Sequence, residues 1–178
     1  MSERTKLWVA DKMKELMKRK PVEKIRITEI CEAAGIERST FYYHFKDKYT
    51  LVAWIFYYSA KSIDVTDLST SAAHLRQMKK DLQFYKRAFE DTSQNALWKY
   101  MLEFFVEENT AAVKKILNTD ELDPMLLYCI RYYCYGAVGM AREWINQDSK
   151  VPAETFVEMT HSCMPQALSD IFASKLSA

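Results

Sequence analysis

A chain of 178 residues suits one domain of ordinary size or a small module joined to a larger one, and it can bury a sizeable core. Apolar residues make up 49% and charged residues 28%, whereas glycine (3) and proline (4) are scarce, which excludes turn-rich all-β architectures and long disordered segments. The net charge of +1 hides an asymmetry: residues 1–50 hold 12 Lys and Arg against 8 Asp and Glu (net +4), and residues 51–178 hold 13 against 16 (net −3). The first fifty residues are therefore better suited to approach a polyanion.

Other function classes find little support in the sequence. No basic start precedes an apolar run, and no stretch of about 18 apolar residues occurs, so we expect a soluble, cytoplasmic protein. The three histidines are scattered, and the three glycines form no phosphate-binding loop, so we expect neither an enzyme nor a cofactor or metal site. The four cysteines form no CxxC pair and are expected to be buried thiols: Cys31, Cys129, Cys134 and Cys163.

The first fifty residues predict three short helices. The first, from about Thr5 to Arg19, carries apolar residues at the 3/4 spacing of a buried stripe. The second begins with Thr28 as N-cap, without a capping box because Cys31 stands where Glu or Gln would reach back. Gly35 ends this helix, since glycine tolerates a left-handed backbone, and a third helix runs over residues 38–45. Helix, short turn and helix form a helix-turn-helix arrangement, whose second helix lies in the DNA major groove.

The rest of the chain also predicts helices. The polar stretch over residues 64–74 is expected to be a joint between two of them. Pro165 is expected either to kink or to divide the last one. One expected helix begins near Asp47. Asp123 and Pro124 are expected to form the cap and first turn of another. The other expected helical ranges, including that one, are 75–91, 95–117, 124–147 and 152–176.

The third helix should have two different faces. At 100° per residue, Phe41 and Phe45 fall on one side, where they lock the helix onto the small core. Because a two-turn helix buries only one stripe, the opposite side is left for a partner. Its hydroxyls and imidazole suit phosphate oxygens and base edges; it consists of Ser39, Thr40, Tyr43 and His44, flanked by Arg38 and Tyr42.

The stretch "ITEICEAAGIERSTFYYHFKDKYTLV", residues 27–52, resembles the DNA-binding signature of TetR-family transcriptional regulators without a gap. The resemblance implies an all-helical dimer, with a helix-turn-helix DNA-binding domain (1–50) and a larger helical domain (51–178) that dimerises and binds a small-molecule effector. The matching positions are Thr28, the turn Ala34-Gly35-Ile36, Thr40-Phe41-Tyr42, His44-Phe45, Lys48 and Leu51.

The same resemblance implies roles for single residues. Arg38, Ser39 and Thr40 would face the bases, although Arg38 could equally pair with Glu37 or contact a phosphate instead of reading guanine. Lys48 would bind a phosphate, assisted by the dipole of its helix. The other backbone contacts would come from Thr28, Tyr42, Tyr43 and His44.

The C-terminal part more weakly resembles a TetR subgroup that includes regulators of dihydroxyacetone kinase operons, in "LVAWIFYYS", "FYKRAF" and "CIRYYCYGAVGMAREWI". The helix over residues 124–147 is apolar on two faces, so we expect one face to meet its own domain and the other a second subunit. The dimer interface would comprise Gly136, Ala137, Gly139 and Met140, and the first three are small enough to permit close approach. An effector pocket would draw on Trp54, Tyr58, Phe84, Trp98, Met101, Phe105, Tyr128 and Tyr132, with polar groups from tyrosines, His74 or Arg131.

These expectations favour a ligand-responsive repressor that binds a palindromic DNA operator as a homodimer. Two alternatives stay open at this point. One is a transcriptional activator controlled by a protein partner docked on the C-terminal domain. The other is a small-molecule-binding helical protein whose DNA module is vestigial.

Overall fold

The computed structural model describes residues 3–175, and every regular element among them is helical, which confirms the expected all-α class. The chain divides into two compact units. The first unit comprises Met1–Lys61 and Lys80–Tyr100, and the second comprises Ser62–Lys79 and Met101–Ala178. No helix in the described part of the chain is both long and apolar enough to cross a membrane.

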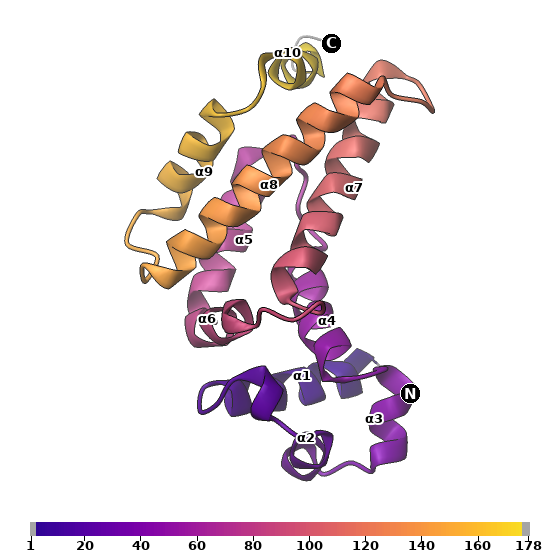
Figure 1. Ribbon diagram of the computed structural model, residues 1–178, viewed down its shortest axis with the longest axis vertical. Coiled ribbons are helices and arrows are strands. Elements are labelled where there is room, and N and C mark those ends of the chain that lie inside the picture. Colours follow the sequence, from indigo (N-terminus) through magenta and orange to yellow (C-terminus); the bar gives the residue numbers. More distant parts are fainter. Residues whose placement is uncertain (1–2, 176–178) are drawn as a thin grey trace. The chain divides into compact units, whose positions relative to one another are not determined.

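The first unit is built on three helices that bury one small core. The indole Nε1 of Trp8 donates to the carbonyl of Ala34 at 2.9 Å, which joins the first helix to the second. Lys14 pairs with Asp81 at 2.7 Å and ties the same helix to a later segment. The elements of this unit are α1 (Glu3–Met17), the 3₁₀ turn η1 (Val22–Lys24), α2 (Ile27–Ala34), α3 (Arg38–His44), α4 (Lys48–Ala60) and α6 (Leu82–Glu90), of which the α-helices are labelled in Figure 1.

The second unit packs longer helices around an apolar interior. Its elements are α8 (Pro124–Asn146), α9 (Ala153–Ser162), α10 (Gln166–Lys175) and most of α5 (Leu68–Lys80) and α7 (Leu97–Leu117) (Figure 1). Lys80 and residues 97–100 belong to the first unit. The rings of Trp144 on α8 and Phe156 on α9 pack at a centroid distance of 5.5 Å. The guanidinium of Arg76 on α5 pairs with the carboxylate of Glu154 at the start of α9. These contacts make α5, α8 and α9 neighbours.

Two helix ends confirm the sequence analysis. Gly35 adopts the left-handed conformation (φ 64°, ψ 38°) after α2, and the next amide, of Ile36, donates back to the carbonyl of Cys31 at 3.0 Å. At the start of α8, a carboxylate oxygen of Asp123 accepts a hydrogen bond from the amide of Met125 at 2.8 Å, and Pro124 occupies the first helical position.

The predicted start of the second helix is wrong. Helix α2 begins at Ile27, with Arg26 rather than Thr28 at its N-cap. Glu29 therefore stands at the third position, where its Oε2 accepts a hydrogen bond from the amide of Arg26 at 2.7 Å. The prediction placed the N-cap two residues too late in the sequence. It therefore put Cys31, and not the carboxylate of Glu29, at the third helical position.

Other boundaries also differ from the prediction. Much of the polar stretch 64–74 belongs to α5, because a carboxylate oxygen of Asp67 accepts from the amide of Ser69 at 2.8 Å and opens a helix there. The expected helix over 75–91 breaks between α5 and α6, at Asp81. Pro165 divides the last helix into α9 and α10, and the expected end at Leu176 lies outside the described residues. Of the cysteines, Cys163 is exposed, because it caps the end of α9.

Candidate functional site

Helix α3 is held in the first unit by two aromatic side chains. Phe41 is fully buried and Phe45 is 4% exposed, as the sequence predicts, and their ring centroids lie 5.8 Å apart. Phe45 also packs edge-on against Trp54 at 5.8 Å. Because α3 has only seven residues, these contacts rather than its own length must fix its orientation.

The opposite side of α3 is open to solvent. Tyr43 is 72% exposed and Tyr42 is 47% exposed, unusually high values for aromatic side chains without a partner surface. Among the eight residues expected to contact DNA, Thr28, Arg38, Ser39, Tyr42 and Tyr43 are exposed, and Thr40, His44 and Lys48 are partly buried.

Arg38 lies next to this aromatic surface. Its guanidinium carbon is 5.9 Å from the ring centroid of Tyr42, a cation–π distance. Glu37 accepts a hydrogen bond from the hydroxyl of Ser39 at 3.3 Å, and no ion pair between Glu37 and Arg38 occurs in the described structure. Two of the three roles considered for Arg38 stay open, namely guanine recognition and a phosphate contact.

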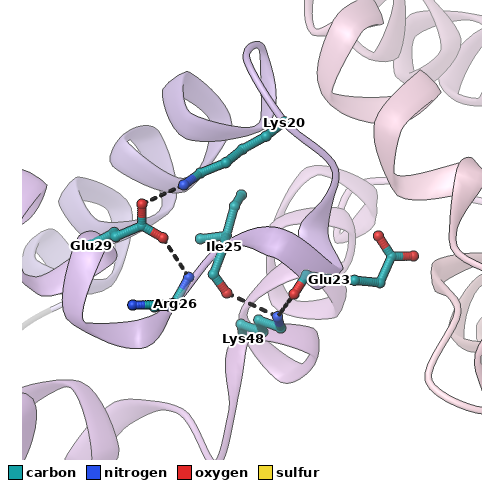
Figure 2. Close-up of polar contacts among 6 residues, drawn as sticks. All are labelled: Lys20, Glu23, Ile25, Arg26, Glu29 and Lys48. Carbon is teal, nitrogen blue, oxygen red and sulfur yellow. Dashed lines mark hydrogen bonds and ion pairs between the residues drawn. The ribbon is translucent and has the colours of Figure 1, made fainter.

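Lys48 anchors the connection that precedes α2. Its ammonium donates to the carbonyl oxygens of Glu23 at 2.8 Å and of Ile25 at 2.9 Å, as Figure 2 shows. Burial lowers the pKa of this ammonium group. An ammonium group has three N–H donors, so one donor is left for an external acceptor such as a phosphate oxygen.

Glu29 holds the other side of the same connection. Its carboxylate pairs with the ammonium of Lys20 and also accepts from the amide of Arg26 (Figure 2). The hydrogen bond from Lys20, followed by the backbone hydrogen bond, keeps the pKa of Glu29 below its ordinary value. The start of α2, on which Thr28 lies, is thus fixed by charged side chains on both sides.

His44 occupies the border between the core and the open face. Its Nε2 atom is buried without a hydrogen-bond partner among the described residues, and its ring meets that of Tyr43 edge-on at 5.0 Å. Burial, and after it the positive charge of Lys6, lowers the pKa of His44. The imidazole therefore favours its neutral form, which can donate a single hydrogen bond rather than supply a charge.

The second unit contains a cavity between α5, α7, α8 and α9. Its volume is about 110 Å³, which is several times the volume that one water molecule requires. Most of its wall is apolar, from residues such as Leu75, Met78, Val138 and Phe156. The polar side chains that line it are Ser71, His74, Asn109, Tyr133, Thr160 and His161.

The structure brings only part of the predicted pocket together. Met101, Phe105 and the polar candidate His74 line the cavity. Tyr128 and Tyr132 do not, because the helical period places them opposite Cys134 and Val138; they are 66% and 67% exposed and stack on each other. The remaining candidates, Trp54, Tyr58, Phe84 and Trp98, belong to the first unit.

Asn109 was not identified from the sequence. This residue and His74 are the two buried polar residues of the cavity wall. Asn109 is 4% exposed, and its position four residues after Phe105 and four before the buried Val113 places it on the apolar side of α7. A lone amide at helical spacing within an apolar stripe is the signal that could have found it.

One face of α8 stays uncovered in the single chain. One of its two apolar faces is buried at Ile130, Cys134, Val138, Ala141 and Trp144, although Leu127 at the edge of this face is 37% exposed. The outer face is exposed, and it carries Met125, Tyr128, Tyr132, Tyr135, Gly136 and Met140. Ala137 and Gly139, of the predicted dimer interface, are half-buried at its border.

Comparisons with known proteins agree with this geometry. Residues 11–55 match the family model described as "Bacterial regulatory proteins, tetR family", and residues 72–166 match "Transcriptional regulator C-terminal region". No curated protein matches the sequence.

Several solved structures share the fold at low sequence identity. The dihydroxyacetone kinase operon activator DhaS is 18% identical, with a TM-score of 0.64 over 99% of this chain and 98% of its own. A tetR-family regulator from Streptomyces coelicolor is 14% identical (TM-score 0.58; 99% and 90% covered). NalD, the secondary repressor of the MexAB-OprM multidrug efflux pump in Pseudomonas aeruginosa, is 16% identical (TM-score 0.54; 92% and 96% covered).

Proposed function

Because this chain belongs to the TetR family of transcriptional regulators, we propose that it represses a palindromic operator as a homodimer and leaves the DNA when a small molecule binds. As a member of this family it is a DNA-binding regulator and not an enzyme. We further propose that it acts in the cytoplasm, that residues 1–50 bind the DNA, and that residues 51–178 dimerise and bind the effector.

The observation that carries the DNA-binding proposal is the open face of α3. A helix locked by Phe41 and Phe45 exposes two tyrosines beside a guanidinium, and the flanking connection is held by Lys48. In this proposal Arg38, Ser39 and Thr40 face bases, where hydroxyl, methyl and guanidinium groups discriminate between base pairs. The backbone contacts come from Thr28, Tyr42, Tyr43, His44 and Lys48.

The dimer proposal is supported by the outer face of α8. Glycine in a helix interior destabilises it by about 0.5–1 kcal/mol relative to alanine. Apart from its chain neighbours and the nearby backbone of α8, a Cβ atom added at Gly136 or Gly139 would meet no atom of the described residues within 4 Å, so no such contact explains a glycine at either position. Close approach of a second α8 would explain both. A two-fold dimer then predicts half-sites about one DNA turn apart, roughly 34–36 Å.

The sign of regulation has a second candidate. The structurally similar DhaS is an operon activator, whereas NalD is a repressor. An activator that responds to a protein partner on the C-terminal part is therefore the alternative. A pull-down from native lysate that recovers one stoichiometric partner, together with transcription that falls when the gene is deleted, would favour it.

Binding to the DNA upstream of the protein's own gene, measured at several salt concentrations, tests the proposal. We expect specific binding, and the logarithm of its association constant should fall linearly with the logarithm of the salt concentration. Thr40→Ala should change the preference among operator variants, because Thr40 is proposed to face the bases. Absence of specific binding, or binding without salt dependence, would refute the proposed function.

A further inference from the structure

The cavity in the second unit has a defined chemical character. We propose that it binds an uncharged, largely apolar molecule with one hydrogen-bond donor, and that Asn109 accepts that donor. This inference rests on the proposed ligand-responsive function and specifies the class of its ligand.

The wall of the cavity excludes fixed charge. None of its lining residues is Asp, Glu, Lys or Arg. Burial raises the pKa of Tyr133 and of Cys134 to about 12, so both stay neutral at physiological pH. Only the two histidines could carry a charge there. A charged ligand would lose its hydration in this site and gain no fixed opposite charge in return.

The amide of Asn109 supplies the polar contact. Its Nδ2 donates to the carbonyl of Phe105 at 2.8 Å, one helical turn back, and lies 3.7 Å from the sulfur of Cys134. Both hydrogen bonds of this side chain use its NH₂ group, and no hydrogen bond to Oδ1 occurs among the described residues. Because an amide oxygen has two lone pairs, Oδ1 can accept a hydrogen bond from a molecule in the cavity. A hydroxyl or N–H group on a ligand would donate this hydrogen bond.

One further polar side chain of the wall, that of Thr160, offers no free proton to a ligand. The hydroxyl of Thr160 donates to the carbonyl of Phe156 at 2.9 Å, so its proton is used within α9. Around it, side chains such as Met78, Met101 and Val157 present only carbon and sulfur to the cavity. The favoured ligand is therefore apolar over most of its surface, with its donor at the α7 side.

Three two-ring probes separate the features of this proposal: 1-naphthol (neutral, one donor), naphthalene (neutral, no donor) and 1-naphthalenesulfonate (anionic). Titration of the full chain, followed by fluorescence, should show saturable binding of both neutral compounds. We expect 1-naphthol to bind about two- to tenfold more tightly than naphthalene, the effect of one hydrogen bond. The sulfonate should not saturate in the same concentration range.

Variants assign the donor contact. Asn109→Leu should abolish the preference for 1-naphthol and retain binding of naphthalene, whereas Gln77→Leu, at an exposed amide on α5, should change neither. Val138→Phe, which fills the cavity, should weaken both neutral probes at least tenfold. The three-probe comparison on the unsubstituted protein decides the class of ligand even if a variant does not fold. A preference for 1-naphthol that persists in folded Asn109→Leu would refute the contact with Asn109.

Two results would overturn the inference. Tighter binding of the sulfonate than of 1-naphthol would mean that the histidines make an anion site, and no saturable binding of either neutral probe would mean that the cavity is not a ligand site. Operator binding measured on the same preparation keeps the two proposals apart. Loss of operator binding with intact 1-naphthol binding would refute the regulator function alone.

Discussion

Helices α3 and α8 both expose tyrosines, but their surroundings differ. On α3, Tyr42 lies beside the guanidinium of Arg38, and the surface is small. On α8, Tyr128 stacks against Tyr132 with ring planes 19° apart, along a helix of 23 residues. The first combination of aromatic and cation suits a polyanion, and the second suits an apolar protein surface. Neighbouring charge, rather than residue type, separates the two proposed partners.

The largest effect is expected from the buried side of α3. Phe41→Ala should destabilise the protein by about 3–5 kcal/mol, because it removes a fully buried ring from a small core. Urea denaturation measures this. The matched change on the open side, Tyr43→Ala, should alter the free energy of unfolding by less than about 0.5 kcal/mol and weaken DNA binding. Equal destabilisation by both changes would contradict the two-faced description of α3.

A charge on the outer face of α8 should separate the subunits. Tyr132→Glu places a carboxylate in the proposed interface, where an unpaired charge costs several kcal/mol, so the dimer should weaken about 100-fold or more. Sedimentation at micromolar concentration should then show a monomer with an unchanged helical spectrum and reduced operator affinity. Leu117→Glu, at an exposed residue that ends α7, should leave the dimer intact. A dimer that survives Tyr132→Glu would move the interface away from α8.

A substitution of Lys48 can separate its anchoring of the connection before α2 from its proposed contact with a phosphate. Lys48→Ala removes two hydrogen bonds from an ammonium group to carbonyl oxygens, and we expect a loss of about 1–3 kcal/mol in the free energy of unfolding. If its third donor also meets a phosphate in each subunit of the proposed dimer, the slope of the salt dependence of DNA binding should fall by about 1.8, which is about 0.9 for each lost phosphate contact. Lys46→Ala, at an exposed neighbour, removes the same charge without the two carbonyl contacts. An unchanged slope in Lys48→Ala, measured where the variant is folded, would leave Lys48 only its anchoring role.

Local chemistry explains which parts of the fold could be predicted from the sequence. Gly35, the Asp123–Pro124 start of α8 and the burial of Phe41 and Phe45 follow from the backbone preferences and spacing of residues close in sequence. The start of α2 was missed because its N-cap residue, Arg26, is not a preferred capping residue, and the carboxylate of Glu29 instead accepts a hydrogen bond from the amide of Arg26.

The cavity could not be predicted in the same way, because its wall comes from four helices and two loop residues far apart in the chain. Aromatic content alone pointed to Tyr128 and Tyr132, which the structure leaves exposed, whereas the aliphatic Val138 and the amide Asn109 line the space. Which apolar face of α8 turns inward depends on packing against α7 and α9, and helical period alone leaves both faces equivalent.

The smallest effect concerns the protonation of His44, at the border between the two faces of α3. Because burial and the charge of Lys6 lower its pKa in the folded protein, the unfolded chain, in which histidine titrates near pH 6.5, binds the proton more readily. The neutral imidazole therefore favours the folded state fully above about pH 6.5, and this contribution is lost as the pH falls through the lower pKa of the folded protein.

Urea denaturation between pH 5 and pH 8 measures this effect of His44. The unsubstituted protein should lose stability relative to His44→Gln as the pH falls. If operator binding takes up a proton at His44, affinity should also rise at low pH, because the nearby phosphates favour imidazolium. A stability difference between the unsubstituted protein and His44→Gln that stays constant with pH would show that His44 titrates alike in both states.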